Sequence, residues 1–187
     1  IYFDLGDFKN SEKNYQKSLK VFSKLGNKRG VAIAEGGLGE VHLENNKLSD
    51  ANKYFTKALK VFEQIKDQPK LIRFYMKRVD CLQMLKEYDM AREDLEKGEE
   101  IAIKLNDKSF IFEVRLYSIL NDYYKEISSI PETEKALIDL DDKTLRNANQ
   151  AFLYYNLWLL KGRGSYKKKA CKLYEKLYAA KPSYVYR

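Results

Sequence analysis

The amino-acid sequence predicts an all-α protein, an α-solenoid of stacked antiparallel helix pairs. The first observation is a phrase that occurs three times, with its copies 40 residues apart: SEKNYQKSLKVFSKLGN at 11–27, ANKYFTKALKVFEQIKD at 51–67 and AREDLEKGEEIAIKLND at 91–107. The second is another segment with apolar residues at helical spacing between successive copies. Helix pairs that recur at a fixed period cannot cover their own apolar faces, so each pair buries its face against the next.

The repeated phrase predicts one helix of each pair. It places small, large and small residues four and three positions apart, which puts them on one face of a helix. Each copy ends at Asn27, Asp67 or Asp107, whose side chains can cap the helix that follows. The residues in register are Ser11, Ala51 and Ala91, then Tyr15, Phe55 and Leu95, then Ser18, Ala58 and Gly98.

The segments between the phrases predict the other helix of each pair. Apolar residues recur there at helical spacing, and proline is confined to positions 69, 131 and 182. The first of these helices contains GGLG at 36–39, which we interpret as a thin helix surface for close packing. The apolar positions are Val31, Ala34, Leu38, Val41 and Leu48 in the first segment, and Leu71, Tyr75, Val79, Leu82 and Leu85 in the second.

The pattern becomes irregular after Asp107. RLYSILNDYYKE at 115–126 keeps helical spacing, but its partner, PETEKALIDLDD at 131–142, is short, opens at Pro131 and lacks the small-large-small triplet. Asp142 is a candidate cap for the next helix. We therefore expect a single domain over 1–187, with three regular units over about 1–107, an irregular unit over about 108–142 and a terminal helix pair over about 143–181.

One unit carries a family resemblance. It resembles a tetratricopeptide repeat through Leu38, Gly39, His42, Ala51, Phe55 and Ala58. The resemblance covers about residues 1–107, and the period of 40 resembles the longer-helix variety of bacterial sensory and signalling proteins and of cortical scaffold proteins. Tyr2 falls in register with His42 and Leu82, so we expect the chain to begin inside its first helix and to be a fragment of a longer protein.

The resemblance implies a non-catalytic scaffold that binds a protein or peptide on its concave surface. The first helix of each pair would line that surface, and residues there need not serve the core. Tyr117 and Tyr124 have two readings that the sequence leaves open: contact with a partner, or packing between adjacent helices. The candidate partner-binding residues are Glu40, Leu43, Arg73, Lys77, Asp80, Tyr117, Asn121 and Tyr124.

A speciality of the family is the capture of the C-terminal carboxylate of heat-shock chaperones. Repeats with that role resemble one another in two features. The first helix of the second unit carries an Asn, and the first helix of the third unit carries a Lys-x3-Arg motif. Here the segment 35–38 contains no Asn, and the third helix offers Arg73-x3-Lys77, which is the reverse order. These departures argue against such a clamp.

Catalytic, metal and cofactor sites are not predicted. His42 is the single histidine and occupies a position where the repeat packs an aromatic residue. Cys81 and Cys171 have no CxxC spacing, and we expect both to be buried as small apolar residues. GGLG lacks the preceding strand and following Lys of a phosphate loop. An enzymatic role would require a catalytic domain outside this chain.

The formal net charge of +8 is concentrated at one end. Residues 161–187 hold nine Lys and Arg against one acid, Glu175, whereas the preceding residues carry equal numbers of both signs. We expect Lys167, Lys168, Lys172 and Lys176 to form a basic, solvated helix face; the alternative is nucleic-acid binding through Lys161–Arg187.

The longest apolar run, AFLYYNLWLL, is too short to cross a bilayer, and no signal-peptide pattern opens the chain. The expected location is therefore cytoplasmic, as the sensor or interaction segment of a larger signalling protein.

Overall fold

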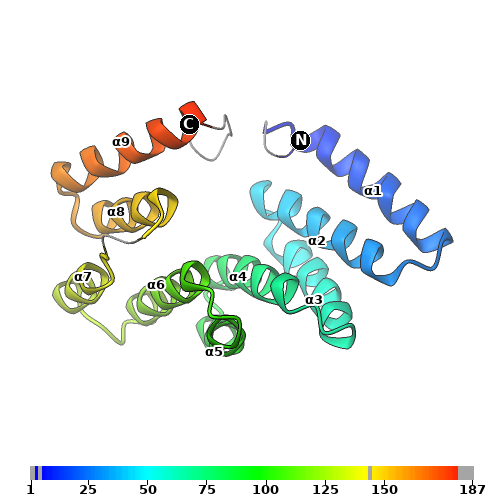
Figure 1. The fold of residues 1–187 in the computed structure, drawn as a ribbon, viewed down its shortest axis with the longest axis horizontal. Helices are drawn as coiled ribbons and strands as arrows, with labels where there is room; N and C mark the ends of the chain where they lie inside the picture. The colour runs from blue at the N-terminus through cyan, green and yellow to red at the C-terminus, as the bar shows by residue number, and fades with distance from the viewer. Residues whose placement is uncertain (1–2, 4–5, 143–144, 181–187) are drawn as a thin grey trace.

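The computed structural model describes residues 3, 6–142 and 145–180, and every regular element in these ranges is an α-helix. Figure 1 shows successive antiparallel helices wound into a curved stack, which confirms the all-α solenoid. In chain order the helices are α1 (Phe8–Lys24), α2 (Lys28–Glu44), α3 (Leu48–Gln64), α4 (Gln68–Met84), α5 (Tyr88–Lys104), α6 (Lys108–Tyr124), α7 (Ile130–Asp139), α8 (Asn147–Lys161) and α9 (Gly164–Ala180).

The turns set the regular spacing of the first six helices. After α1, the N–H of Asn27 donates to the carbonyl of Phe22 at 2.9 Å and the N–H of Gly26 donates to that of Ser23 at 3.2 Å. This is a Schellman ending, and Gly26 takes the left-handed conformation at φ +64°. The side chain of Asn27 then accepts from the N–H of Gly30 and caps α2. The predicted caps Asp67 and Asp107 act in the same way on α4 and α6.

The glycine face of α2 packs closely against three other helices. Gly36, Gly37 and Gly39 are all buried, and each faces an aromatic ring from another helix. A Cβ atom added at any of them would overlap that ring, so the GGLG segment is a packing surface, as predicted. The closest approaches of such a Cβ would be 2.2 Å to Phe74 of α4 from Gly36, 2.3 Å to Tyr15 of α1 from Gly37, and 2.7 Å to Phe55 of α3 from Gly39.

The predicted small-large-small face lies in the core. Ala51, Phe55 and Ala58 of α3 are fully buried, and Phe62 on the same helix stacks on Phe74 of α4 with ring centroids 5.3 Å apart. Buried apolar residues continue from this cluster through α4–α6 to α8. The core is therefore a ribbon between neighbouring helices.

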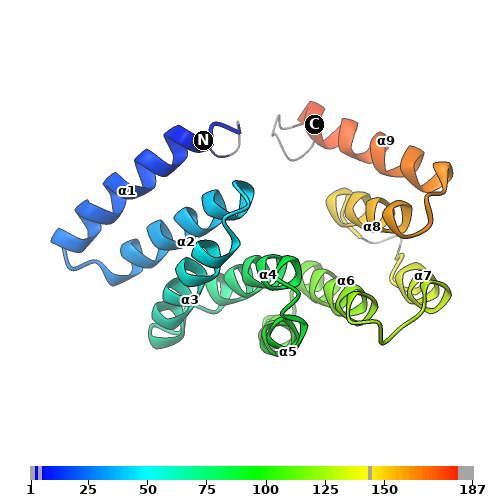
Figure 2. The ribbon, with the colours of Figure 1, turned by 180° about the vertical axis from the view of Figure 1, so that it is seen from behind.

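The helices form two layers along the curve. The even-numbered helices α2, α4, α6 and α8 lie on the inner side, and α1, α3, α5, α7 and α9 lie on the outer side (Figures 1 and 2). Each inner helix contacts the next inner helix directly. Helix α7 has only 10 residues, and Glu134 on it pairs with Lys161 and Arg163 at the end of α8.

Two details of the sequence prediction are wrong. Cys81 is buried, but Cys171 is exposed on α9, because it does not fall on the side of that helix where Ala170 is buried. Helix α8 begins at Asn147 with Arg146 at its N-cap, so Asp142 does not cap it. A cap directly precedes the first residue of its helix, and Asp142 comes several residues too early in the sequence for that position.

Gly36→Ala is expected to destabilise the fold by about 1–3 kcal/mol, because its methyl group would overlap the buried ring of Phe74. Gly98→Ala is the matched control, since a Cβ there would lie 3.6 Å from Val114 in ordinary contact. Alanine also favours a helix interior over glycine, so the control should gain up to about 1 kcal/mol. Urea unfolding measures both changes, and equal midpoints for the two variants would contradict the packing role of Gly36.

Candidate functional site

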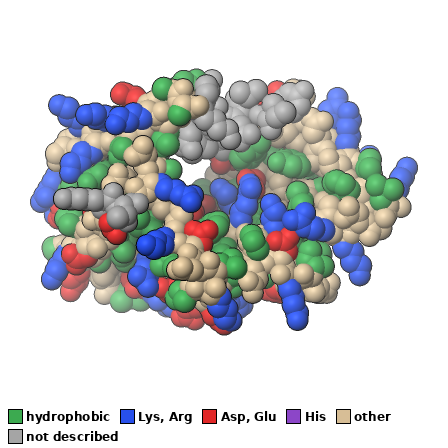
Figure 3. Space-filling model, viewed as in Figure 1, with side chains coloured by type: hydrophobic (Ala, Val, Ile, Leu, Met, Phe, Trp, Pro, Cys, Tyr) green, Lys and Arg blue, Asp and Glu red, His purple; other side chains and the backbone are tan. Residues whose placement is uncertain are grey.

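The inner helices line a groove of about 870 Å³. It lies toward their C-terminal ends, and Figure 3 shows that the molecule is hollowed at its middle, with charged and apolar side chains around the opening. The main contributors are Leu43 and Glu44 from α2, Lys77, Asp80, Gln83 and Met84 from α4, Tyr117, Leu120 and Tyr124 from α6, and Phe152, Tyr155, Asn156 and Leu159 from α8.

One side of the groove is apolar and exposed. Met84 is 54% exposed and Leu159 is 56% exposed, and Tyr124 and Tyr155 are 42% and 39% exposed. These four side chains come from three helices and meet in the same groove. Exposed apolar groups that gather in a hollow mark a contact surface, whereas scattered ones need no explanation.

Aromatic contacts fix the shape of this apolar side. Tyr124 stacks on Tyr88 of α5 with ring centroids 6.4 Å apart, and Tyr117 packs on Phe152 of α8 at 5.6 Å. The packing reading therefore holds for both tyrosines, and contact with a partner stays a prediction. Tyr117 joins α6 to α8 while it lines the groove, and Tyr124 presents an open face to it.

The other side of the groove is polar. Asp80 of α4 is partly buried and interacts with the hydroxyl of Tyr117, and Lys77 lies one turn before it on the same helix. Burial raises the pKa of Asp80, although Lys77 and Tyr117 act in the opposite direction. Burial also raises the pKa of the neighbouring Glu113, and the charge of Asp80 adds to that effect. Two carboxyl groups thus share one poorly hydrated region.

Glu40 and Arg73 lie beside this groove and bind each other. The Arg73 guanidinium donates to a Glu40 carboxylate oxygen at 2.8 Å, and this contact links α2 to α4. Glu40 is almost fully buried, whereas half of the Arg73 side chain is exposed. The carboxylate is therefore occupied within the wall, and the guanidinium remains accessible at one edge.

Asn121 is fully buried and does not reach the groove surface. Its amide donates to the backbone carbonyl of Tyr88 at 3.0 Å, and its oxygen accepts from Gln83 at 3.4 Å. It therefore ties α6 to α5 and α4 behind the surface. Of the eight predicted contact residues, five line the groove: Leu43, Lys77, Asp80, Tyr117 and Tyr124.

The sequence prediction missed the contribution of α8. Phe152, Tyr155 and Leu159 lie at spacings of three and four on that helix and complete the apolar side. The apolar run AFLYYNLWLL contained the signal, but its inner face could not be assigned because the repeat register is lost in the short unit around α7.

The predicted basic surface lies on α9. Lys167, Lys168, Lys172 and Lys176 are all exposed there, and residues 181–187 of the predicted basic end lie outside the described residues. The ammonium of Lys167 lies 5.0 Å from the ring centroid of Trp158. Lysine side chains thus cover aromatic faces on α8 that base stacking would require.

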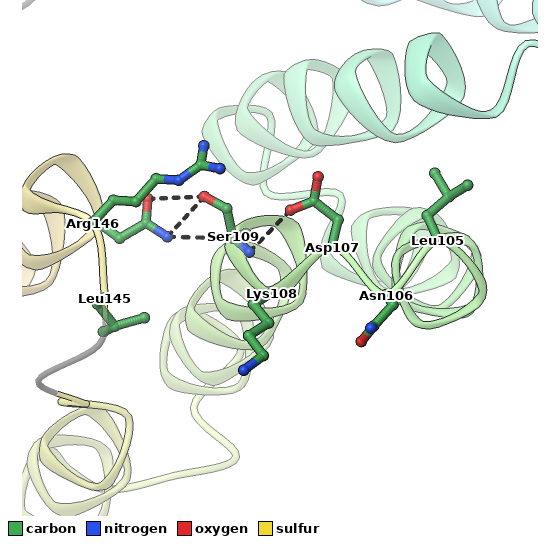
Figure 4. Close-up of a pocket in the computed structure, with 8 residues that line it drawn as sticks. Leu105, Asn106, Asp107, Lys108, Ser109, Leu145 and Arg146 are labelled. Carbon is green, nitrogen blue, oxygen red and sulfur yellow. Dashed lines mark hydrogen bonds between the residues drawn. The ribbon is translucent and has the colours of Figure 1, made fainter.

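A second hollow, of about 440 Å³, lies where the α5–α6 turn meets the start of α8 (Figure 4). Ser109 of α6 and Asn149 of α8 face each other in it, and the Asn149 amide donates to the Ser109 hydroxyl at 3.1 Å. Asp107 accepts from backbone N–H groups of α6. Asp107, Ser109 and Asn149 are thus paired within the chain, and the contact between Ser109 and Asn149 joins α6 to α8.

The single histidine and the buried cysteine have packing contacts within the fold. His42 is packed against Tyr54 with ring centroids 5.2 Å apart, as the repeat pattern predicted. Burial raises the pKa of Cys81 to about 11, and its thiol donates to the carbonyl of Leu48. No cluster of three metal-ligating side chains occurs among these residues, and none of their helices is long and apolar enough to span a membrane.

Stacked helix pairs around a concave groove define the chain as a helical-repeat protein. The family model described as tetratricopeptide repeat matches residues 1–64, which confirms the resemblance to that family over this part of the chain. Tetratricopeptide repeats are protein-interaction scaffolds, and a fold of this kind is typically non-catalytic. The comparison with curated proteins found no match.

Asp80→Asn is expected to stabilise the chain at neutral pH. Because the folded state raises the pKa of Asp80, ionisation is less favourable in the folded chain than in the unfolded chain. The resulting cost is absent below the ordinary value of 3.8 and grows as pH rises through the raised value. Urea unfolding across pH should give wild-type and variant stabilities that agree in acid and separate toward neutrality. A constant difference at every pH would contradict the assignment.

Proposed function

We propose that the chain is a non-catalytic scaffold that holds a segment of a partner protein in the groove between α2, α4, α6 and α8. The observation that carries this proposal is the exposed apolar surface of Met84, Tyr124, Tyr155 and Leu159. Their exposure leaves apolar area in water inside a hollow, and a partner that covers it gains hydrophobic free energy.

The groove is suited to rigid binding. The Glu40–Arg73 pair links α2 to α4, the Asp80–Tyr117 contact links α4 to α6, and the Tyr117–Phe152 contact links α6 to α8. A wall cross-linked in this way loses little conformational entropy when a partner binds. The partner segment therefore bears most of the ordering cost, as is usual for an extended or helical peptide.

The period of 40 residues also supports a role in a signalling protein. Long-helix repeats of this kind resemble those of sensory and signalling proteins, so we place the chain in the interaction or sensor segment of a larger cytoplasmic signalling protein. Nucleic-acid binding through Lys161–Arg187 has less support, because Glu134 binds Lys161 and Arg163 and lysines cover the α8 rings. Such binding would weaken steeply as salt concentration rises.

Tyr124→Ala combined with Tyr155→Ala is expected to abolish partner capture while the fold is kept. Each ring supplies rigid contact area, and loss of one hot-spot aromatic costs about 2 kcal/mol or more of binding free energy. Both rings are partly exposed, so the free energy of unfolding should fall by less than about 3 kcal/mol in total.

The measurement is affinity capture from extracts of the source cells, quantified by mass spectrometry. Ile103→Ala is the control, because it removes an exposed apolar side chain from the outer helix α5. Partners that bind the wild type and the control should be lost with the double variant. Equal capture by all three chains would rule out the groove as the binding site.

A further inference from the structure

We propose that the segment held in the groove is basic as well as apolar: it places a Lys or Arg side chain against Asp80 and bulky apolar side chains against the surface formed by α6 and α8. This inference rests on the proposed function and specifies the chemistry of the partner. The opposite sign, an acidic segment, is what the net charge of +8 would suggest on its own.

The charges inside the groove differ from the charge of the whole chain. Among the side chains that line it, Glu44 and Asp80 oppose a single cation, Lys77. Glu113 lies close enough to Asp80 for the charge of Asp80 to disfavour ionisation of Glu113, and Glu44 disfavours ionisation of Asp80 in the same way. The nearby Glu40–Arg73 pair is neutral as a unit. The groove therefore carries net negative charge in a chain that is positive overall.

The orientation of the inner helices adds to this field. Helices α2, α4 and α6 present their C-terminal ends to the groove, and those ends carry partial negative charge from the backbone carbonyls. The last turns of α4 and α6 contain no basic residue. Lys125, which follows α6, is paired with Asp89 of the outer helix α5. A cation from the partner would meet favourable charge from both the side chains and the helix ends.

The position of Asp80 favours contact with a cation of the partner over contact with water. Its carboxylate is partly buried at the boundary between the polar side and the apolar side of the groove. A partner that covers the apolar side would exclude water from this carboxylate. Burying a charge in that way is costly unless the partner brings an opposite charge within hydrogen-bonding distance. Lys or Arg next to a bulky apolar residue meets both requirements.

The experiment is a selection of random peptides displayed on phage against the 187-residue chain. Groove-dependent peptides are those that bind the wild type and lose binding to Tyr124→Ala. They are expected to be enriched in Lys or Arg near large apolar residues. Enrichment in Asp or Glu, or no charge preference, would overturn this inference while leaving the groove as a binding site. Absence of any groove-dependent peptide would overturn the proposed function as well.

Affinities of a selected synthetic peptide then locate the contact. Asp80→Asn should weaken binding about tenfold or more, because a hydrogen bond to a charged group is lost. Glu96→Gln removes the same charge from an exposed position on α5 and should have no effect. Lys77→Gln should tighten binding, since it removes the competing cation. Equal effects of Asp80→Asn and Glu96→Gln would contradict the contact.

A change in the peptide keeps the test independent of protein folding. Replacing its Lys or Arg by Gln should weaken binding to the wild type about as much as Asp80→Asn does. The same replacement should cost little more on the Asp80→Asn chain, because the two groups act on each other. Additive losses would assign the peptide's cation to another site and overturn the inference.

Discussion

The structure depends on the close approach of helices at positions where one side chain is small and its neighbour is large. The glycine face of α2 receives Tyr15, Phe55 and Phe74 from three other helices, and no room remains there for a Cβ atom. The contact of Gly36 with Phe74 sets the distance between α2 and α4, and buried apolar side chains pack α4 against α6 and α6 against α8. The inner helices are therefore held at fixed spacing, and the groove between them is a consequence of core packing.

The groove also keeps features that cost stability. Asp80 and Glu113 share a poorly hydrated region, and Met84 and Leu159 expose apolar surface to water. A chain selected only for stability would replace such groups, whereas binding sites commonly retain them. Of these residues, Asp80, Met84 and Leu159 line the groove and are also proposed to contact a partner, which is the pattern expected of a site that is completed by its ligand.

Local patterns predicted the fold because several helix boundaries depend on capping side chains close by in the sequence. The caps Asn27, Asp67 and Asp107 and the small-large-small face can be identified from residue spacing alone. Register also placed Leu43, Lys77 and Asp80 on the inner wall. It could not distinguish Tyr124 at the surface from Asn121 behind it, because the backbone carbonyl that accepts from Asn121 belongs to Tyr88, the first residue of another helix, α5. The α8 residues were missed for a different reason: the short helix α7 shifts the register that would have assigned their face.

The three methionines provide a direct measurement of where a partner binds. Met84 lies in the groove, Met90 is exposed on the outer helix α5 and Met76 is buried in the core. In the NMR spectrum of the methyl-labelled chain, a bound peptide should shift the ε-methyl signal of Met84 and leave those of Met90 and Met76 in place. A shift of Met90 with an unchanged Met84 would place the partner on the outer surface and contradict the account.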